Sequence, residues 1–453
     1  MAFEGDLAGV REQLEGELLA PGDAGWEDAR QGFNLALDPR PALISVPRSE
    51  ADVSATVRFA REAGLRVAAQ GTAHGAGALS SLEDSILLRT TAMKGVELGA
   101  AARTAKARAG AVWADLVPQA SEQGLAMLHG SAPNLGIVGY TIGGGVGWYS
   151  RKHGLACNRA KGFEIVGADG ELRRVNANSD PDLFWALRGG GGSFGVVTSV
   201  EFELLEITEV YAGTLFFPFE RAEEVLRAWR DWTAGVPEEM TSVGRLMQFP
   251  PIPDIPEPIR GKAFAILELI YIGDEESGRE IAAPLTDLGP AMNSLAAVPP
   301  AEIADLHMDP PGPVSGITGH MLLGDLGDDA LGALLQVAGP ESGSKLTSVE
   351  VRHGGGALSR PDPNAGALAS LPGNFNLFAV GSTMDPAAVA PTQDRLAQIQ
   401  AALKPFEAGR YMSFCDQPTD FEAAFPAEVC DRLRALRAKH DPDGLFHPNQ
   451  ELG

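Results

Sequence analysis

The chain has 453 residues, of which 44% are hydrophobic and 21% charged, so it can bury the cores of two domains. Its 60 acidic and 36 basic residues give a formal net charge of -24, which repels phosphate backbones and anionic lipid. We therefore expect neither nucleic acid nor a membrane as a partner. Cys157, Cys415 and Cys430 show no CxxC spacing, so they suggest reduced core thiols, with neither a disulfide framework nor a metal site.

The first elements in chain order are a helix, a strand and a loop. The N-terminus, Met1–Asp6, shows no basic segment before an apolar run, and no later stretch approaches the roughly 18 apolar residues of a membrane span, which favours a soluble cytoplasmic protein. Pro47–Gly64 reads as a helix that Ser49 caps and Gly64 ends. A strand follows over residues 65–70, and it ends in the glycine loop Gly71–Gly77.

Two further glycine-rich loops follow in the N-terminal half. Short strands are predicted over Ile86–Arg89 and Ala105–Ala109, and a helix over Val112–Gln123. The second loop contains Gly143–Gly147 and the third Gly189–Gly195. Glycines in such numbers let the backbone approach a ligand closely and expose amides to phosphate oxygens, so we interpret the three loops together as a binding site.

The third loop matches GxGxxG at Gly190, Gly192 and Gly195, which would suggest a Rossmann fold. That fold needs a strand before the glycines and a helix after them. Here a helical run, Asp180–Leu187, precedes the loop and a strand-like run, Val196–Phe202, follows it. A nicotinamide-dependent dehydrogenase is therefore the disfavoured reading.

The pattern changes after about Tyr211. Strand-like runs such as Leu215–Phe217 and Ala263–Ile272 alternate with amphipathic helices such as Glu220–Thr233 and Ala388–Leu403. The proline-rich segment Pro250–Pro258 predicts a stiff, extended connector. We expect an α+β protein with three segments: residues 1–206, a second domain over 207–406, and a C-terminal segment, 407–453, with a final helix and a turn-rich tail.

Several of these segments together resemble the berberine-bridge branch of the FAD-linked oxidases. The shared features are the loop Gln70–Gly75, the run Gly136–Gly139 before Gly143–Gly145, the segments Ser150–Leu155 and Asp182–Arg188, and the C-terminal run Asp441–Phe446 closing on Asn449. They cover the N-terminal half and the last fifty residues in a specific joint order, whereas the middle of the chain is only loosely diagnostic.

The resemblance implies a two-part FAD-binding domain of the PCMH type, built from both chain ends, and a substrate domain with an antiparallel sheet covered by helices. It also implies that His74 bonds covalently to the flavin and that Tyr140 lies beside the flavin. The full set of implied FAD-binding residues is Gln70, Gly71, Thr72, Ala73, His74, Gly75, Ala132, Leu135, Gly136, Val138, Gly139, Tyr140, Gly143, Gly144, Gly145, Gly147, Gly195, Val197 and Asn449.

This chain also departs from the family pattern. Many relatives attach the flavin a second time through a cysteine at the position of Ala132, so a single attachment is expected here. Ala73 and Gln70 replace the family's glycine and arginine in the histidine loop, and Ser413 replaces an asparagine in the segment Tyr411–Phe414. Relatives use the position of Leu135 as a gate for O2, and leucine there implies slow reoxidation by O2 and a role for another electron acceptor.

Glu350 is the first candidate for the catalytic base. In the strand-like run Thr347–His353, alternation places Ser348, Glu350 and Arg352 on one face, and that face is predicted to line the flavin cavity or to contact solvent. Relatives often carry their base on this sheet. Tyr411 is the second candidate, because a tyrosine hydroxyl can orient a substrate or relay a proton.

The function that these features favour is an FAD-dependent oxidoreductase acting on an alcohol, phenol, amine or polyketide-like compound by hydride transfer to flavin N5. The alternative is a binding protein that carries flavin or sequesters a drug-like ligand without turnover.

Overall fold

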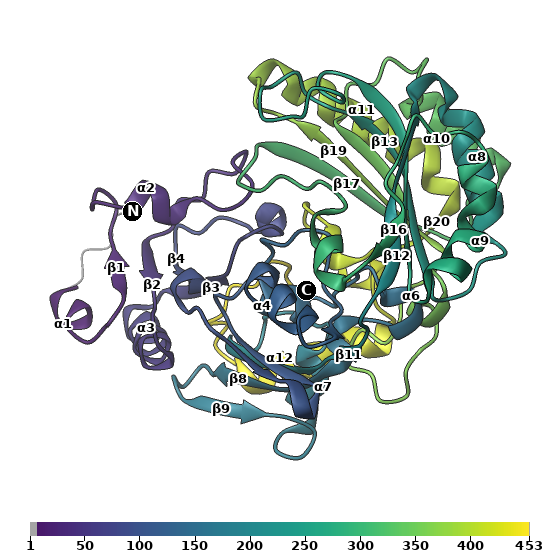
Figure 1. The fold of residues 1–453 in the computed structure, drawn as a ribbon. Helices are drawn as coiled ribbons and strands as arrows, with labels where there is room; N and C mark the ends of the chain where they lie inside the picture. The colour runs from purple at the N-terminus through teal and green to yellow at the C-terminus, as the bar shows by residue number, and fades with distance from the viewer. Residues whose placement is uncertain (1–6, 453) are drawn as a thin grey trace.

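The computed structural model of the chain describes residues 7–452 (Figure 1). The N-terminal stretch Met1–Asp6, on which the expected cellular location partly depends, lies outside the described residues. No helix within the described part of the chain is long and apolar enough to cross a membrane.

Two sheets with their helices form the N-terminal part of the molecule. The first has the order β1 (Glu17–Leu19), β2 (Leu43–Val46), β4 (Ser85–Arg89), β3 (Arg66–Gln70), and its last three strands are parallel. The second is antiparallel, in the order β5 (Val96–Gly99), β6 (Thr104–Arg108), β10 (Val196–Glu203), β8 (Ala160–Val166), β9 (Leu172–Val175). Strands β7 (Leu125–Ala126) and β11 (Leu205–Glu206) pair with each other. The helices are α1 (Ala8–Arg11), α2 (Trp26–Arg30), α3 (Glu50–Ala63), α4 (Trp113–Ser121), α5 (Ile137–Ile142), α6 (Ser150–His153) and α7 (Pro181–Leu187).

Helix α3 and strand β3 set the position of the first glycine loop. The hydroxyl of Ser49 accepts the amide N–H of Asp52 at 3.2 Å, and Gly64 ends the helix with φ +68°, as the sequence predicted. The chain reverses there into β3, whose last residue is Gln70.

The C-terminal end of the chain returns to β3. Helix α12 (Ala427–His440) leads into this tail. The N–H of Val67 donates to the carbonyl of Leu445 at 2.8 Å, and the N–H of His447 donates to the carbonyl of Val67 at 2.9 Å. As a result, Asn449 lies next to the first glycine loop, although it is 374 residues from Gly75 in sequence. Its Nδ2 is 3.8 Å from the position that a Cβ on Gly75 would take.

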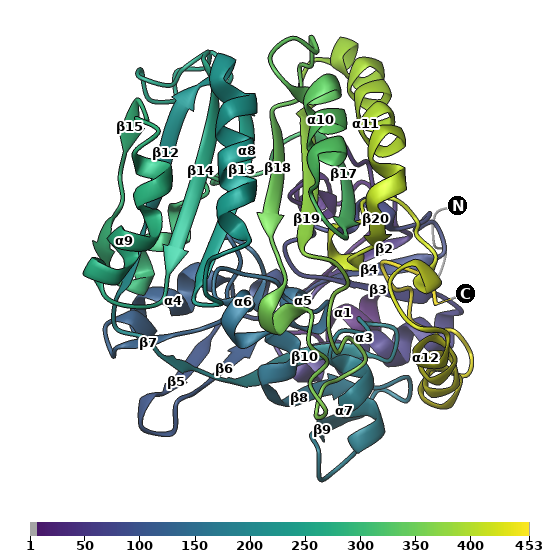
Figure 2. The same cartoon turned by 90° about the vertical axis from the view of Figure 1, so that its right-hand side faces the viewer.

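The rest of the chain forms one antiparallel nine-stranded sheet. Its order is β15 (Met292–Asn293), β12 (Val210–Pro218), β14 (Ala263–Tyr271), β13 (Met240–Gln248), β18 (Ser348–His353), β19 (Phe375–Ser382), β17 (Gly316–Leu323), β20 (Glu407–Gly409), with β16 (Ala296–Val298) also pairing with β12. Helices α8 (Ala222–Thr233), α9 (Glu275–Thr286), α10 (Asp328–Ala338) and α11 (Val389–Leu403) belong to this part, and Figure 2 shows α8, α10 and α11 over one face.

The two faces of this sheet differ in chemistry. Leu215, Leu267 and Leu377 point to the helices and pack with Trp229 and Leu334 in an apolar core. On the other face, Val243 and Ile270 pack with Trp148 of the N-terminal part. The sheet therefore lies between its covering helices and the N-terminal part, and its second face can build a buried site at the contact between the two parts. The fold class that the sequence predicted is confirmed.

One local prediction was wrong. The segment Pro250–Pro258 is not extended but folds into successive turns. The N–H of Ile255 donates to the carbonyl of Ile252, and that of Ile259 donates to the carbonyl of Pro256. Proline fixes its own φ but leaves ψ free, so the non-proline residues between the prolines can close turns.

Candidate active site

The first glycine loop presents His74 at a partly buried position. The ring of His74 stacks on Phe33 with centroids 3.8 Å apart, and its Nδ1 lies 2.9 Å from Oγ1 of Thr72. The same Thr72 oxygen accepts the N–H of Gly136 at 3.3 Å, which ties this loop to the start of α5. The other ring nitrogen, Nε2, is buried, and the side chain of Asn134 interacts with the ring.

Burial sets the protonation state of His74. It lowers the pKa of His74 to about 4, and the negative charge of Asp309 opposes this only in part. The ring is therefore neutral near pH 7 and has a lone pair available, which a covalent bond to a ligand requires. Ala73 holds φ +62°, a conformation that favours glycine, so the loop keeps the backbone shape that a glycine would adopt.

The second glycine loop follows α5 and has no room for side chains. Gly144 and Gly145 have φ of +121° and +78°. A Cβ on Gly145 would lie 2.6 Å from the ring of Tyr140, and one on Gly147 would lie 1.8 Å from the carbonyl of His129. In the third loop, α7 precedes the glycines and β10 follows them, which is the reverse of the Rossmann order and agrees with the sequence prediction.

Polar atoms between these loops lack a partner. The hydroxyl of Tyr140 and Nε2 of His129 are buried without a hydrogen bond to any residue of the described part of the chain. An unsatisfied buried polar atom costs about 1–3 kcal/mol, so such a cluster points to a polar ligand. FAD is rich in nitrogen and oxygen acceptors and donors, and a glycine-rich backbone can approach it closely, so the residues present fit this cofactor.

Tyr411 and Ser413 bring the C-terminal segment onto the second glycine loop. The Tyr411 hydroxyl accepts the N–H of Gly145 at 2.7 Å, and the Ser413 hydroxyl donates to the carbonyl of Gly143 at 2.8 Å. The backbone N–H of Tyr411 donates to Nε2 of His320 at 2.9 Å. Burial raises the pKa of Tyr411 to about 12, so its hydroxyl stays protonated. Ser413 therefore contacts this loop in place of the family's asparagine.

The remaining predicted residues lie around these loops. Gln70 accepts a hydrogen bond from Arg89 at 3.0 Å, and Leu135 donates its N–H to the carbonyl of Ala132 at 3.3 Å. Val138 and Val197 are core residues with 6% exposure. The positions not yet placed are Gly71, whose Cβ would lie 3.6 Å from the carbonyl of Ala109; Gly139, with open space beside it; and Gly195, with φ +153°. The three cysteines of the described residues are free and buried, and none lies at the Ala132 position.

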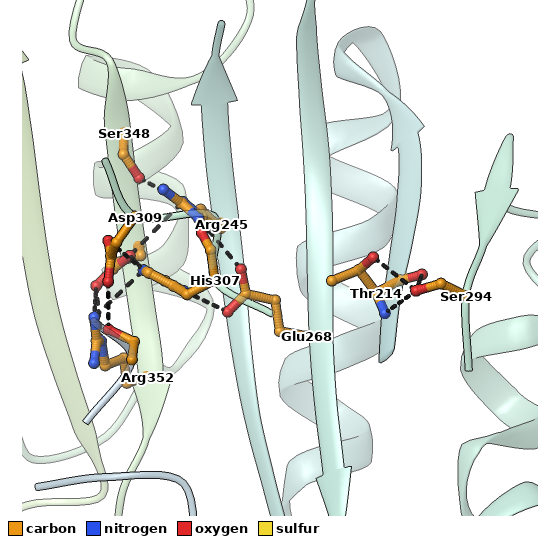
Figure 3. Close-up of polar contacts among 10 residues, drawn as sticks. Thr214, Arg245, Glu268, Ser294, His307, Asp309, Ser348 and Arg352 are labelled. Carbon is orange, nitrogen blue, oxygen red and sulfur yellow. Dashed lines mark hydrogen bonds and ion pairs between the residues drawn. The ribbon is translucent and has the colours of Figure 1, made fainter. Parts of the chain in front are cut away.

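Glu350 belongs to a buried charged cluster on the sheet face that meets the N-terminal part. Figure 3 shows Arg245, Glu268, His307, Asp309 and Arg352 of this cluster. Oε1 of Glu350 accepts from Nε of Arg352 at 2.7 Å, and Oε2 lies 2.8 Å from Nε2 of His307. Nδ1 of His307 lies 2.6 Å from Glu268, and Arg245 is 3.3 Å from Glu268 and 3.7 Å from Glu350. Glu350 is 2% exposed, so the interpretation of its face as solvent-exposed was wrong.

Charges within this cluster determine its protonation. Burial acts to raise the pKa of Glu350, but the positive charges of Arg352, His307 and Arg245 outweigh it and hold that pKa far below its ordinary range. Burial and Arg245 act to lower the pKa of His307, but its three acidic neighbours raise it to about 9. Near pH 7 Glu350 is therefore ionised and His307 protonated.

Asp309 connects this cluster to the glycine loops. Its Oδ2 accepts from the hydroxyl of Ser131, in the loop before α5, at 2.7 Å. Its Oδ1 is 4.0 Å from Nε2 of His307, and its charge also acts on His74. Ser131 also lines a pocket between the two parts. The other residues that line it include Gly147, Trp148, Val243 and Arg352. Asp309 therefore bonds to the loop before α5 on one side and faces the charged cluster on the other.

Comparisons with known proteins agree with this geometry. Residues 41–176 match the FAD binding domain family. The chain is 25% identical over 448 residues to an FAD-linked oxidoreductase of Dictyostelium discoideum, with 97% of this chain and 95% of that protein covered. It is 33% identical over 194 residues to (R)-6-hydroxynicotine oxidase of Paenarthrobacter nicotinovorans, covering 43% of this chain and 42% of that protein.

Solved structures share the fold over almost the whole length. The BBE-like 1 protein of Physcomitrella patens has a TM-score of 0.86 at 19% identity, with 99% of both chains covered. The berberine bridge enzyme of Eschscholzia californica has a TM-score of 0.81 at 18% identity, with 98% of both covered. Together, the fold and the matched domain define an FAD-linked oxidoreductase. The chain carries an FAD-binding domain and shares its fold with solved structures of the berberine-bridge type.

Sequence reasoning missed His307, Glu268, Arg245 and Asp309. They come from β13, β14 and the loop after the short helix Pro300–Asp305, so no fixed spacing connects them. One signal was present: Glu268 is the only charged residue in the otherwise apolar strand Ala263–Tyr271. A buried charge needs a partner, so a lone glutamate in such a strand predicts a charged cluster.

Proposed function

We propose that the protein oxidises a small organic molecule, an alcohol, phenol, amine or polyketide-like compound, with FAD attached covalently through His74 alone. The observation that carries this proposal is the arrangement of Asp309, whose charge acts on His74, whose Oδ2 accepts from Ser131 at 2.7 Å and whose Oδ1 lies 4.0 Å from His307 in the cluster around Glu350. Such a reaction requires a bound flavin and a positioned base, and His74 and the charged cluster would supply the attachment and the base.

The proposed roles divide between the two parts. His74, Tyr140, the glycine loops and Asn449 hold the cofactor, and the absence of cysteine at Ala132 supports a single attachment. When bound, FAD supplies the oxidising power by accepting a hydride at N5. Glu350 accepts the proton from the substrate's O–H or N–H group, while Tyr411, with its hydroxyl on the second glycine loop, orients the substrate. The burial of both side chains keeps water away from the reacting groups.

Two relatives illustrate the range of substrates to be tested. One is named as an oxidase of 6-hydroxynicotine, and another, glucooligosaccharide oxidase of Sarocladium strictum, is 32% identical over 226 residues. A nitrogen heterocycle and a sugar differ widely, so the screen should include both classes. Either O2 or another acceptor could then complete the turnover, and Leu135 is the residue expected to limit access of O2.

The test is an anaerobic screen of the purified protein. Yellow protein whose colour bleaches with a sugar, phenol, amine or aromatic polyketide supports the proposal. Stable colour with tight binding of such a compound would instead favour a flavin-carrying binding protein. Colourless protein that takes up no FAD would contradict the proposal.

A further inference from the structure

The cluster around His307 contains ionisable side chains to which the proposed reaction gives no role. Both ring nitrogens of His307 face carboxylates, Nδ1 to Glu268 at 2.6 Å and Nε2 to Glu350 at 2.8 Å. An ionised carboxylate can only accept a hydrogen bond, so with Glu268 and Glu350 both ionised each ring nitrogen carries a proton. His307 and Glu350 are each 2% exposed and Glu268 is fully buried, so this proton sits between carboxylates away from solvent.

A weakly basic Glu350 needs an onward path for any proton that it accepts. Arg352, His307 and Arg245 all stabilise its ionised form, which makes retention of a proton unfavourable. The groups facing His307 are Arg245 from β13, Glu268 from β14, Glu350 and Arg352 from β18, and Asp309 two residues ahead in its own loop. Among the acids, Asp309 is the most exposed, with 25% of its side chain accessible.

The backbone between His307 and Asp309 brings their two side chains together, with Nε2 of His307 4.0 Å from Oδ1 of Asp309. Met308 between them has φ +57°, a left-handed conformation that is costly for a residue other than glycine. Such strain persists where the surrounding structure enforces it, and it is common at functional sites. Asp309 is held from its other side by the hydroxyl of Ser131, which leaves Oδ1 free to face His307.

We propose that His307 and Asp309 form a proton exit from Glu350 to solvent, with Glu268 as the residue that positions the His307 ring. This inference rests on the proposed function, since it assigns a route to the proton that the substrate loses. Nε2 of His307 is the only nitrogen in the route, because Nδ1 stays bonded to Glu268 throughout.

The proton that the substrate loses reaches solvent through four transfers. The substrate's O–H or N–H bond breaks and its proton bonds to Glu350, while the electron pair left on the oxygen or nitrogen forms a double bond to the neighbouring carbon. That carbon's C–H bond breaks at the same time, and its hydrogen leaves with both electrons as the hydride that the bound cofactor would take up. Nε2–H of His307 transfers its proton to Asp309, and the vacated Nε2 takes the proton from Glu350. Asp309 releases its proton to water, so every side chain returns to its starting state. The Nε2 to Oδ1 distance of 4.0 Å exceeds a hydrogen bond, so Asp309 must rotate toward the ring for the transfer.

The experiment measures proton exchange and needs no substrate. In the FAD-loaded protein with 15N-labelled histidine, NMR signals that His307→Gln removes are those of His307. We expect two protonated ring nitrogens up to about pH 9, with Nε2–H exchanging with water much faster than Nδ1–H. Asp309→Asn should slow the exchange of Nε2–H by roughly 10²-fold, the effect of losing one positioned base.

Two variants separate this role from a merely structural one. Asp309→Glu restores a carboxylate and should restore the exchange, whereas Glu302→Gln, which removes an exposed acid nearby, should leave it unchanged. Equal exchange in the wild type and Asp309→Asn, or a neutral His307 near pH 7, would overturn the exit path. Such a result would leave the oxidoreductase proposal intact, because that proposal fails only in the anaerobic screen.

Discussion

Replacing His307 by glutamine tests the buried cluster through its pH dependence. The pKa of His307 rises from its ordinary 6.5 to about 9 on folding, which is worth about 3 kcal/mol of folding free energy. Because the folded pKa is the higher one, this contribution is complete below about pH 6.5 and is lost as the pH rises through 9. Glutamine has no charge to lose, so its variant lacks this dependence.

Unfolding by urea, followed by tryptophan fluorescence, gives the free energy of unfolding of both proteins. We expect the difference between the wild type and His307→Gln to be about 2 kcal/mol larger at about pH 7 than at about pH 9.5. The matched control is His320→Gln. Burial lowers the pKa of His320 to about 3, so it is neutral throughout this range and its variant should show nearly the same loss at both pH values. An equal loss at both pH values for His307→Gln would refute the assignment of a protonated His307.

Four further predictions concern the cofactor site and its chemistry. His74→Ala should release FAD on acid precipitation while the far-UV circular dichroism spectrum is unchanged; retention of FAD by this variant would exclude His74 as the attachment. Glu350→Gln should slow anaerobic flavin reduction by about 10²- to 10⁴-fold with FAD still bound, and an unchanged rate would move the base role to Tyr411 or elsewhere. Leu135→Val should speed reoxidation by O2 in stopped-flow mixing; fast reoxidation in the wild type, or no gain in the variant, would contradict the gate. Ala73→Gly should raise the free energy of unfolding by up to about 1 kcal/mol, because it relieves the left-handed φ, and the urea midpoint should rise with it. A lower midpoint would show that this φ carries no strain.

Local signals in the sequence predicted much of the fold. Ser49 and Gly64 mark the ends of α3 because capping depends on residues within one turn of the helix. The alternation of Ser348, Glu350 and Arg352 was correctly read as one strand face, since side chains alternate in any strand. The strand alone could not show whether this face is buried or exposed to solvent, because the N-terminal part that covers it is distant in sequence.

The site was predictable only where a contiguous motif carries it. The loop around His74 is such a motif, and the resemblance identified it as a candidate from the sequence alone. The cluster of Arg245, Glu268, His307 and Asp309 is assembled from separate strands and a loop through sheet register, and register depends on packing across the whole sheet. The prolines of Pro250–Pro258 led to the prediction of an extended segment, but the residues between them close turns.

Covalent attachment of FAD at His74 is the claim on which the site assignment most depends. Acid-precipitated wild-type protein, digested with trypsin and examined by mass spectrometry, tests it directly. We predict a single flavin-bearing peptide, the one that contains His74, with no flavin on any peptide that contains Ala132. Recovery of all the flavin as free FAD in the supernatant, or its detection on a different peptide, would contradict the account.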